Sequence, residues 1–304
     1  MTADRPLLGI GLMLGFCVLA PMTDAIAKSL GDSIPLLQLL LTRFAAQVIL
    51  LLPFVWYSGS ILAPSRRVVR LTAIRTVLHI FGIGMMFSAL RYLPLADAVA
   101  IAFVMPFIML LLGRYILNEE VGPRRLIACA VGFIGTLFVV QPSFAEVGWP
   151  ALLPLGVEVV FSFFMLVTRQ IAKEIDPIAL QSLSGLMALP VLFLLILIPN
   201  GMAELPMFSV VFPDVGDLVL LIALGAMGTL AHLLMSWSLR FAPSATLAPM
   251  QYLEIPVATA IGWLVFRDLP NGLAAFGIAL TVASGLYIVL RERALSRLPA
   301  PPAV

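Results

Sequence analysis

Charged side chains are scarce in this chain of 304 residues: Asp, Glu, Lys and Arg make up 11% of it, against 62% hydrophobic residues. A soluble domain usually carries about 25% charged residues, because its surface must be wetted by water. So few charges cannot cover a soluble fold of this length, which argues against the soluble enzyme classes. The mean hydropathy of +1.10 is typical of a chain that dissolves in lipid.

Cysteine and basic tracts are scarce as well. The two cysteines, Cys17 and Cys129, lie in apolar runs without CxxC or Cys/His spacing, which argues against a disulfide framework and a metal site. The net charge is only +2 and no long basic tract is present, so nucleic-acid binding has no support. A GxxxxGK[ST] phosphate loop is also missing, which argues against an ATP-driven pump. We expect no metal and no cofactor.

Long hydrophobic runs are what the chain has in abundance. A helix needs about 20 residues to cross the hydrocarbon core of a bilayer, and ten segments approach or meet that length. They are residues 7–27, 35–56, 71–90, 95–117, 126–140, 150–167, 178–198, 218–239, 245–266 and 272–290. The first run is longer than a signal-peptide core and has no A-x-A cleavage pattern, so we expect it to be retained as a helix.

The basic residues between these segments are unevenly distributed. Lys and Arg accumulate in the cytoplasmic loops of membrane proteins. One set of alternate loops holds Arg5, Arg66, Arg67, Arg70, Arg75, Arg114, Arg124, Arg125, Arg169, Lys173, Arg240, Arg291, Arg293 and Arg297. The other set holds Lys28, Arg91 and Arg267. The asymmetry predicts a bacterial inner-membrane protein with ten spans and with both termini in the cytoplasm.

The two halves of the chain resemble each other in sequence. The Arg-Tyr-Leu-Pro of residues 91–94 is matched by the Arg-Phe-Ala-Pro of residues 240–243. The Ile-Ala-Lys of residues 26–28 recurs at residues 171–173. Such internal similarity indicates a duplicated structural unit.

Each half contains five predicted spans, and five is an odd number. The second half must therefore enter the membrane with the opposite polarity to the first. We expect an all-α membrane protein built as two inverted five-helix repeats, residues 1–145 and 146–304, which together form one membrane domain.

The segment from the fourth to the fifth span carries Pro106, Gly113, Glu119 and Gly132. This order of residues resembles the EamA-type ten-helix members of the drug/metabolite transporter superfamily, and the likeness covers essentially the whole chain. The second copy carries Asp268 where that family commonly has Glu. The resemblance implies a central cavity between the halves, alternating access, and cargoes that range from amino acids to nucleotide-like cofactors and drugs.

Few polar side chains lie at the centre of the predicted spans. An ionisable group there costs at least about 2.5 kcal/mol to insert, so it normally faces an aqueous cavity or a partner. The candidates for substrate binding or coupling are Glu158, His79, His232, Glu254, Gln47, Gln251, Tyr252 and Trp237. Phe161 and Phe164 lie on the same central helices, and we expect them mainly to pack.

Glu158 is the strongest candidate, because the apolar residues around it offer its carboxylate no local partner. It suits either proton coupling or binding of a substrate's donor groups, and the alternative is a hydrogen bond to a neighbouring helix. Each histidine could orient a heterocycle, relay a proton or close an interhelical bond. Pro249 and Pro256 near Glu254 predict a broken helix whose freed carbonyls line a cavity.

Asp24 and Lys28 stand four residues apart near the periplasmic end of the first span, and Arg43 lies within the second. This spacing favours a structural ion-pair cluster at the membrane interface. Because intramembrane acids are often functional, the alternative is that Asp24 is a gate residue.

Two other classes of membrane protein are disfavoured. A membrane-embedded enzyme would need paired acids, a His cluster or a Ser/His arrangement at helical spacing. A channel would need repeated rings of polar side chains. The sequence has neither pattern, so we expect secondary or facilitated transport of a small metabolite across the lipid bilayer, by a monomer or a homodimer.

The cargo is constrained by the candidate residues. No basic side chain is predicted at mid-membrane, so a strongly anionic cargo is disfavoured, and a neutral or weakly cationic, partly aromatic metabolite is favoured. Residues 15–28 are similar to those of bacterial EamA-type riboflavin importers. Riboflavin uptake is therefore the first specific hypothesis, and export of amino acids or related amphipathic metabolites is the alternative.

Overall fold

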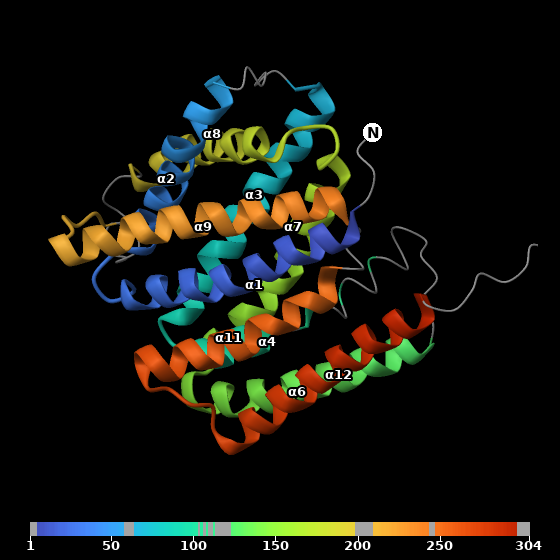
Figure 1. The fold of residues 1–304 in the computed structure, drawn as a ribbon. Helices are drawn as coiled ribbons and strands as arrows, with labels where there is room; N and C mark the ends of the chain where they lie inside the picture. Colours follow the sequence, from blue (N-terminus) through green and yellow to red (C-terminus); the bar gives the residue numbers. More distant parts are fainter. Residues whose placement is uncertain are drawn as a thin grey trace, which may run out of the picture.

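A computed structural model describes residues 5–57, 64–102, 123–197, 209–242 and 247–296, together with residues 104, 105, 108 and 112. Every regular element in these ranges is a helix, which confirms the all-helical prediction (Figure 1). The elements are α1 (Pro6–Ser29), α2 (Leu36–Tyr57), α3 (Arg66–Leu90), α4 (Leu95–Ala102), α6 (Pro123–Val147), η1 (Trp149–Leu152), α7 (Leu153–Ile171), α8 (Pro177–Ile196), α9 (Val215–Phe241), η3 (Ala248–Leu253), α11 (Glu254–Ile261), η4 (Gly262–Phe266) and α12 (Gly272–Ser296).

Seven of the helices in the described ranges are long and apolar enough to cross a membrane. They coincide with the first, second, third, fifth, sixth, seventh and eighth predicted spans. The fourth predicted span begins with α4, and most of its later residues, including Pro106, lie outside the described residues, as do Gly113 and Glu119. The tenth coincides with α12. The count of ten spans stays a prediction.

The ninth predicted span is broken, as the prolines suggested. It runs as the 3₁₀ helix η3, the α-helix α11 and the π-helical turn η4 in succession. Pro256 lies in the first turn of α11, where a missing N–H removes no helical hydrogen bond. Glu254 is the first residue of α11, so the change of helix type places its carboxyl group at a helix start inside the bundle.

The fifth span is much longer than predicted. The sequence favoured an end at residue 140, before Gln141 and Pro142, but α6 continues to Val147. Ser143 stabilises this extension, because its hydroxyl donates to the carbonyl of Val139 (3.0 Å) and lies 3.3 Å from a carboxylate oxygen of Asp97 on α4. The contact with Asp97 joins this extension to α4.

Helices from the first half pair with helices from the second half. The most extensive contacts join α1 to α9, α3 to α7, α2 to α8, and α6 to α12. Figure 1 shows α1 running alongside α9, and α12 alongside α6 at one edge of the molecule. The α6 and α12 backbones approach closely, since a Cβ on Gly277 would lie 2.5 Å from the carbonyl oxygen of Gly135. The two halves are thus interleaved around a shared centre.

Contacts between loops and helix ends fall into two sets. One set joins Arg5 to Phe241, Arg67 to Glu174, and Arg240 to Asp176. The other joins Lys28 to Leu93, Arg91 to Ile34, and Gln38 to Val211. Each set contains only segments that the charge distribution assigned to a single side of the membrane. The connections between elements therefore agree with the predicted order of loops.

Candidate functional site

A partly open cavity lies at the centre of the bundle. Its walls come from α1, α2, α3, α4, α7, α9, η3 and α11, and therefore from both halves of the chain. Seven of the residues singled out from the sequence line it: Asp24, Arg43, His79, Glu158, His232, Gln251 and Glu254. Four others lie elsewhere in the structure: Lys28, Gln47, Tyr252 and Trp237.

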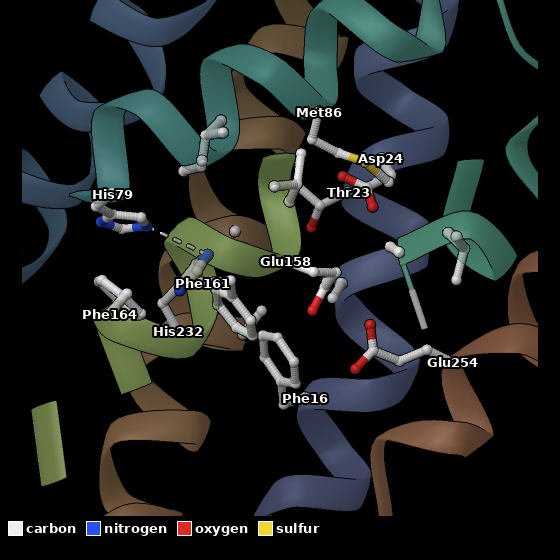
Figure 2. A pocket seen from close by; sticks show the side chains of 18 of the residues that line it. Phe16, Thr23, Asp24, His79, Met86, Glu158, Phe161, Phe164, His232 and Glu254 are labelled. Atoms are coloured by element: carbon white, nitrogen blue, oxygen red, sulfur yellow. Dashed lines mark hydrogen bonds between the residues drawn. The ribbon is translucent and has the colours of Figure 1, made fainter. Parts of the chain in front are cut away.

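Three carboxyl groups meet in one part of the cavity. Figure 2 shows Asp24 on α1, Glu158 on α7 and Glu254 on α11 around the same space. Glu254 lies within electrostatic reach of both other acids, and the thiol of Cys17 lies beside it. Glu158 is 8% exposed. Within the described residues, neither Asp24 nor Glu158 has a hydrogen bond or an ion pair, so a bound molecule could supply their partners.

The two histidines contact each other across the interface between α3 and α9. Their Nε2 atoms are 3.3 Å apart, and their Nδ1 atoms are buried without a partner in the described chain. If both rings are neutral, one Nε2 donates and the other accepts, which leaves one Nδ1 with a proton and the other with a lone pair. His79 and His232 therefore offer one donor and one acceptor (Figure 2).

Aromatic rings form a ladder beside the histidines. Phe16 and Phe161 are nearly parallel, with 6.2 Å between ring centroids, and Phe161 and Phe164 are 5.6 Å apart with a similar tilt. All three line the cavity. Phe161 and Phe164 pack as expected, since Phe164 is 1% exposed and both belong to or border a hydrophobic cluster, and their rings also form part of the cavity wall. Phe16 was missed, although it stands 145 residues before Phe161, the same interval that separates the two Ile-Ala-Lys motifs.

Arg43 is a buried cation in the cavity wall, where the sequence predicted no basic side chain. It is 1% exposed, and its guanidinium donates to the carbonyl of Gly228 (2.6 Å) and to Oε1 of Gln47 (3.2 Å). Gln47 in turn donates to the carbonyl of Gln181 (2.6 Å). Gln47 thus holds Arg43 in place instead of facing the cavity, and the reason given for disfavouring anionic cargo does not hold.

Arg75, which the charge distribution placed among the loop residues, lies inside α3 and is fully buried. The helix begins at Arg66, five residues earlier than predicted, which places Arg75 well inside the bundle. Its guanidinium donates to Thr168 (2.8 Å), Ser184 (2.6 Å) and Gln181 (3.1 Å). It thereby joins α3 to α7 and α8.

The expected ion-pair cluster of Asp24, Lys28 and Arg43 is not formed among the described residues. Lys28 Nζ instead donates to the carbonyls of Leu90 (3.2 Å) and Leu93 (2.7 Å). Carbonyls at a helix C-terminus lack partners within the helix, which makes them good acceptors for an ammonium group. Lys28 therefore ties α1 to the end of α3, while Asp24 faces the cavity (Figure 2).

Gly228 is required by the position of Arg43, because a Cβ there would lie 2.3 Å from Nε of Arg43. We expect Gly228→Ala to lower the free energy of unfolding by about 2 kcal/mol, since the guanidinium must move away from its carbonyl acceptor. Denaturant unfolding in detergent measures this. Gly84→Ala is the matched control, because its Cβ would meet no atom closer than 3.6 Å. Equal stability of the two variants would contradict the packing argument.

A bundle of long apolar helices, with a central cavity that is lined by both halves of the chain and holds a few polar side chains, is the architecture of a membrane transporter. Residues 7–141 and 148–290 each match the EamA-like transporter family. The chain belongs to this family. It is accordingly a transporter of the bacterial membrane that acts on a small molecule, and it is not an enzyme.

The named relatives include transporters of different small molecules. The chain is 30% identical over 226 residues to a riboflavin transporter of Rhizobium johnstonii, covering 74% of this chain and 72% of that protein. It is 26% identical over 297 residues to an S-adenosylmethionine uptake transporter of Rickettsia felis, covering 96% of each. A solved crystal structure of a protein with 18% identity has a TM-score of 0.66 over 95% of this chain and 98% of that one, which indicates the same fold.

Proposed function

We propose that this protein carries a flat heteroaromatic metabolite across the bacterial inner membrane by alternating access. In this proposal ten spans form two inverted repeats, residues 1–145 and 146–304, with both termini in the cytoplasm. The pairing of helices between the halves and the two separate sets of loop contacts support it. Both secondary active and facilitated transport are compatible with such a bundle.

The observation that carries the proposal is the set of unpartnered polar groups in the central cavity. Asp24, Glu158 and the histidine pair line it from α1, α7, α3 and α9. Within the described chain neither carboxyl group has a hydrogen bond or an ion pair, and each histidine has a buried Nδ1 without a partner. Polar groups without partners are costly in apolar surroundings, so these groups are the proposed contacts for substrate or for a coupled proton, together with Glu254 and Gln251.

Riboflavin is the first candidate cargo. It is flat, and it carries donors and acceptors along its ring edges, which suits the ladder of Phe16, Phe161 and Phe164 beside the donor and acceptor of the histidine pair. The relative from Rhizobium johnstonii, which is named a riboflavin transporter, also supports this choice.

S-adenosylmethionine is the second candidate, and the three carboxyl groups favour it. Asp24, Glu158 and Glu254 have no cationic partner among the described residues, so a ligand that brings a positive charge would offset their burial. S-adenosylmethionine carries a sulfonium and an ammonium group beside a flat adenine ring. The full-length similarity to an uptake transporter for this molecule adds to the case.

Labelled uptake separates the candidates and gives the direction of transport. In the first assay, riboflavin-requiring bacteria that express this chain receive labelled riboflavin. In the second, inside-out and right-side-out vesicles receive either labelled riboflavin or labelled S-adenosylmethionine. We expect one of the two to accumulate in cells or in right-side-out vesicles above the empty-vector control. Accumulation only in inside-out vesicles would indicate export, the alternative direction. Accumulation of neither molecule in either vesicle type would overturn the proposed cargo class.

A further inference from the structure

The central cavity is lined by one cationic side chain and by three carboxyl groups. Arg43 stands in the wall formed by α2 and α9, within electrostatic reach of the two histidines. The carboxyl groups of Asp24, Glu158 and Glu254 lie together in another part of the same cavity. No ion pair joins Arg43 to any of these acids in the part of the chain that the structure describes.

Arg43 is held rigidly by neutral groups only. Its hydrogen bonds to Gly228 and Gln47 use part of its donor set of five N–H groups. Gly228 leaves no room for a side chain between the guanidinium and α9, and Gln47 is itself fixed by the carbonyl of Gln181. The remaining N–H groups of this guanidinium can pair with a carboxylate.

The cavity also contains buried polar atoms that lack partners. Gln251 is 2% exposed and His79 is 3% exposed, yet Oε1 of Gln251 and Nδ1 of His79 make no hydrogen bond within the described residues. Both residues line the cavity that holds the three acids. Because unpaired buried groups are unfavourable, they point to a ligand with hydrogen-bonding groups of its own.

We infer that the transported molecule is a zwitterion: its carboxylate binds Arg43, and its cationic group binds among Asp24, Glu158 and Glu254. This inference rests on the proposed function and narrows its cargo class. A single molecule that carries both charges can pair with Arg43 and with the three acids at once, whereas a neutral molecule can form neither ion pair. A flat heteroaromatic ring with an amino-acid side chain therefore fits better than a neutral flavin.

Matched ligands test the inference on the purified full-length protein in detergent or nanodiscs. S-adenosylmethionine is compared with its decarboxylated form, and tryptophan with tryptamine, so that each pair differs only by a carboxylate. We expect at least one zwitterion to bind about 10- to 100-fold more tightly than its decarboxylated partner. In Arg43→Gln this preference is expected to fall to nearly onefold.

Arg75→Lys is the matched control, because Arg75 is buried in the same region but does not line the cavity. It is expected to keep the preference for the carboxylate. Since the preference is a ratio within one variant, partial loss of folded protein does not alter it. An unchanged preference in Arg43→Gln would overturn the inference, as would equal binding of both members of each pair.

The remaining outcomes separate this inference from the proposed function. If riboflavin binds and is transported while neither zwitterion binds, the inference fails and the proposed function stands. If a zwitterion binds through Arg43 but does not cross vesicle membranes, Arg43 stands as a carboxylate-binding residue, while the zwitterion as cargo and the proposed function both fail. If no zwitterion or flavin binds, both are overturned.

Discussion

Glu158→Gln is expected to reduce transport by about 100-fold, the largest effect of any single substitution in the cavity. The side chain is almost fully buried, lines the cavity and has no partner among the described residues. A buried carboxylate that pairs with a cationic ligand is worth about 2–5 kcal/mol, which exceeds tenfold in affinity. The glutamine keeps the size of the side chain but removes the charge and the ability to exchange a proton. Initial rates of labelled uptake in vesicles measure the effect.

Glu174→Gln is the matched control for this substitution. Glu174 lies outside the cavity at the end of α7, where it pairs with Arg67 in solvent, and such exposed pairs contribute about 1 kcal/mol or less. We expect its transport rate to stay within about twofold of the parent rate. Comparable rates for Glu158→Gln and the parent protein would remove Glu158 from the proposed site.

Arg75→Leu is expected to lower the free energy of unfolding by about 3 kcal/mol, the largest effect on stability. The arginine supplies donors to Thr168, Ser184 and Gln181, and each acceptor left unpaired in the interior costs about 1–3 kcal/mol. Removal of the buried charge offsets part of this cost. Unfolding in detergent, followed by circular dichroism or by a thiol-reactive dye, measures the difference.

Two variants calibrate the Arg75 result. Arg75→Lys keeps the charge, but one ammonium group cannot reach three separate acceptors. We therefore expect its free energy of unfolding to lie between those of the parent protein and the leucine variant. Arg70→Leu removes an exposed arginine from the same helix and should change stability by less than about 0.5 kcal/mol. If Arg75→Leu were as stable as Arg70→Leu, the buried network would contribute nothing measurable to folding.

Hydrophobic runs predicted most of the helices, because a membrane span must satisfy its backbone hydrogen bonds internally and must be long enough to cross the hydrocarbon core. The long apolar stretches of α1, α2, α8 and α9 therefore match their predicted bounds closely. The length of α6 was not predicted, and its extension past Pro142 carries the contact of Ser143 with Asp97, 46 residues away. Local composition does not contain such information.

The cost of burying polar groups predicted several of the residues that line the central cavity. Glu158, Glu254 and the two histidines were identified because isolated polar groups in apolar helices need a partner, and all four line one cavity. Arg43 was assigned to an ion pair because Asp24 and Lys28 are close in sequence, yet its acceptors lie on its own helix and on α9. Every residue has a backbone carbonyl, so the sequence does not show which one accepts a hydrogen bond from an arginine. For this reason a buried arginine was assigned to the membrane interface.

Access to the cavity from both sides of the membrane is the central claim, and thiol labelling tests it most directly. Ala20, which lines the cavity, is replaced by cysteine in a chain with Cys17→Ala and Cys129→Ala, and vesicles of each orientation are treated with a membrane-impermeant thiol reagent. The same is done with Ala188→Cys, which is fully buried away from the cavity and should not react. We predict that Ala20→Cys reacts from either side and that the transported metabolite slows both reactions. Reaction from only one side under every condition, or no protection by any transported molecule, would contradict the account.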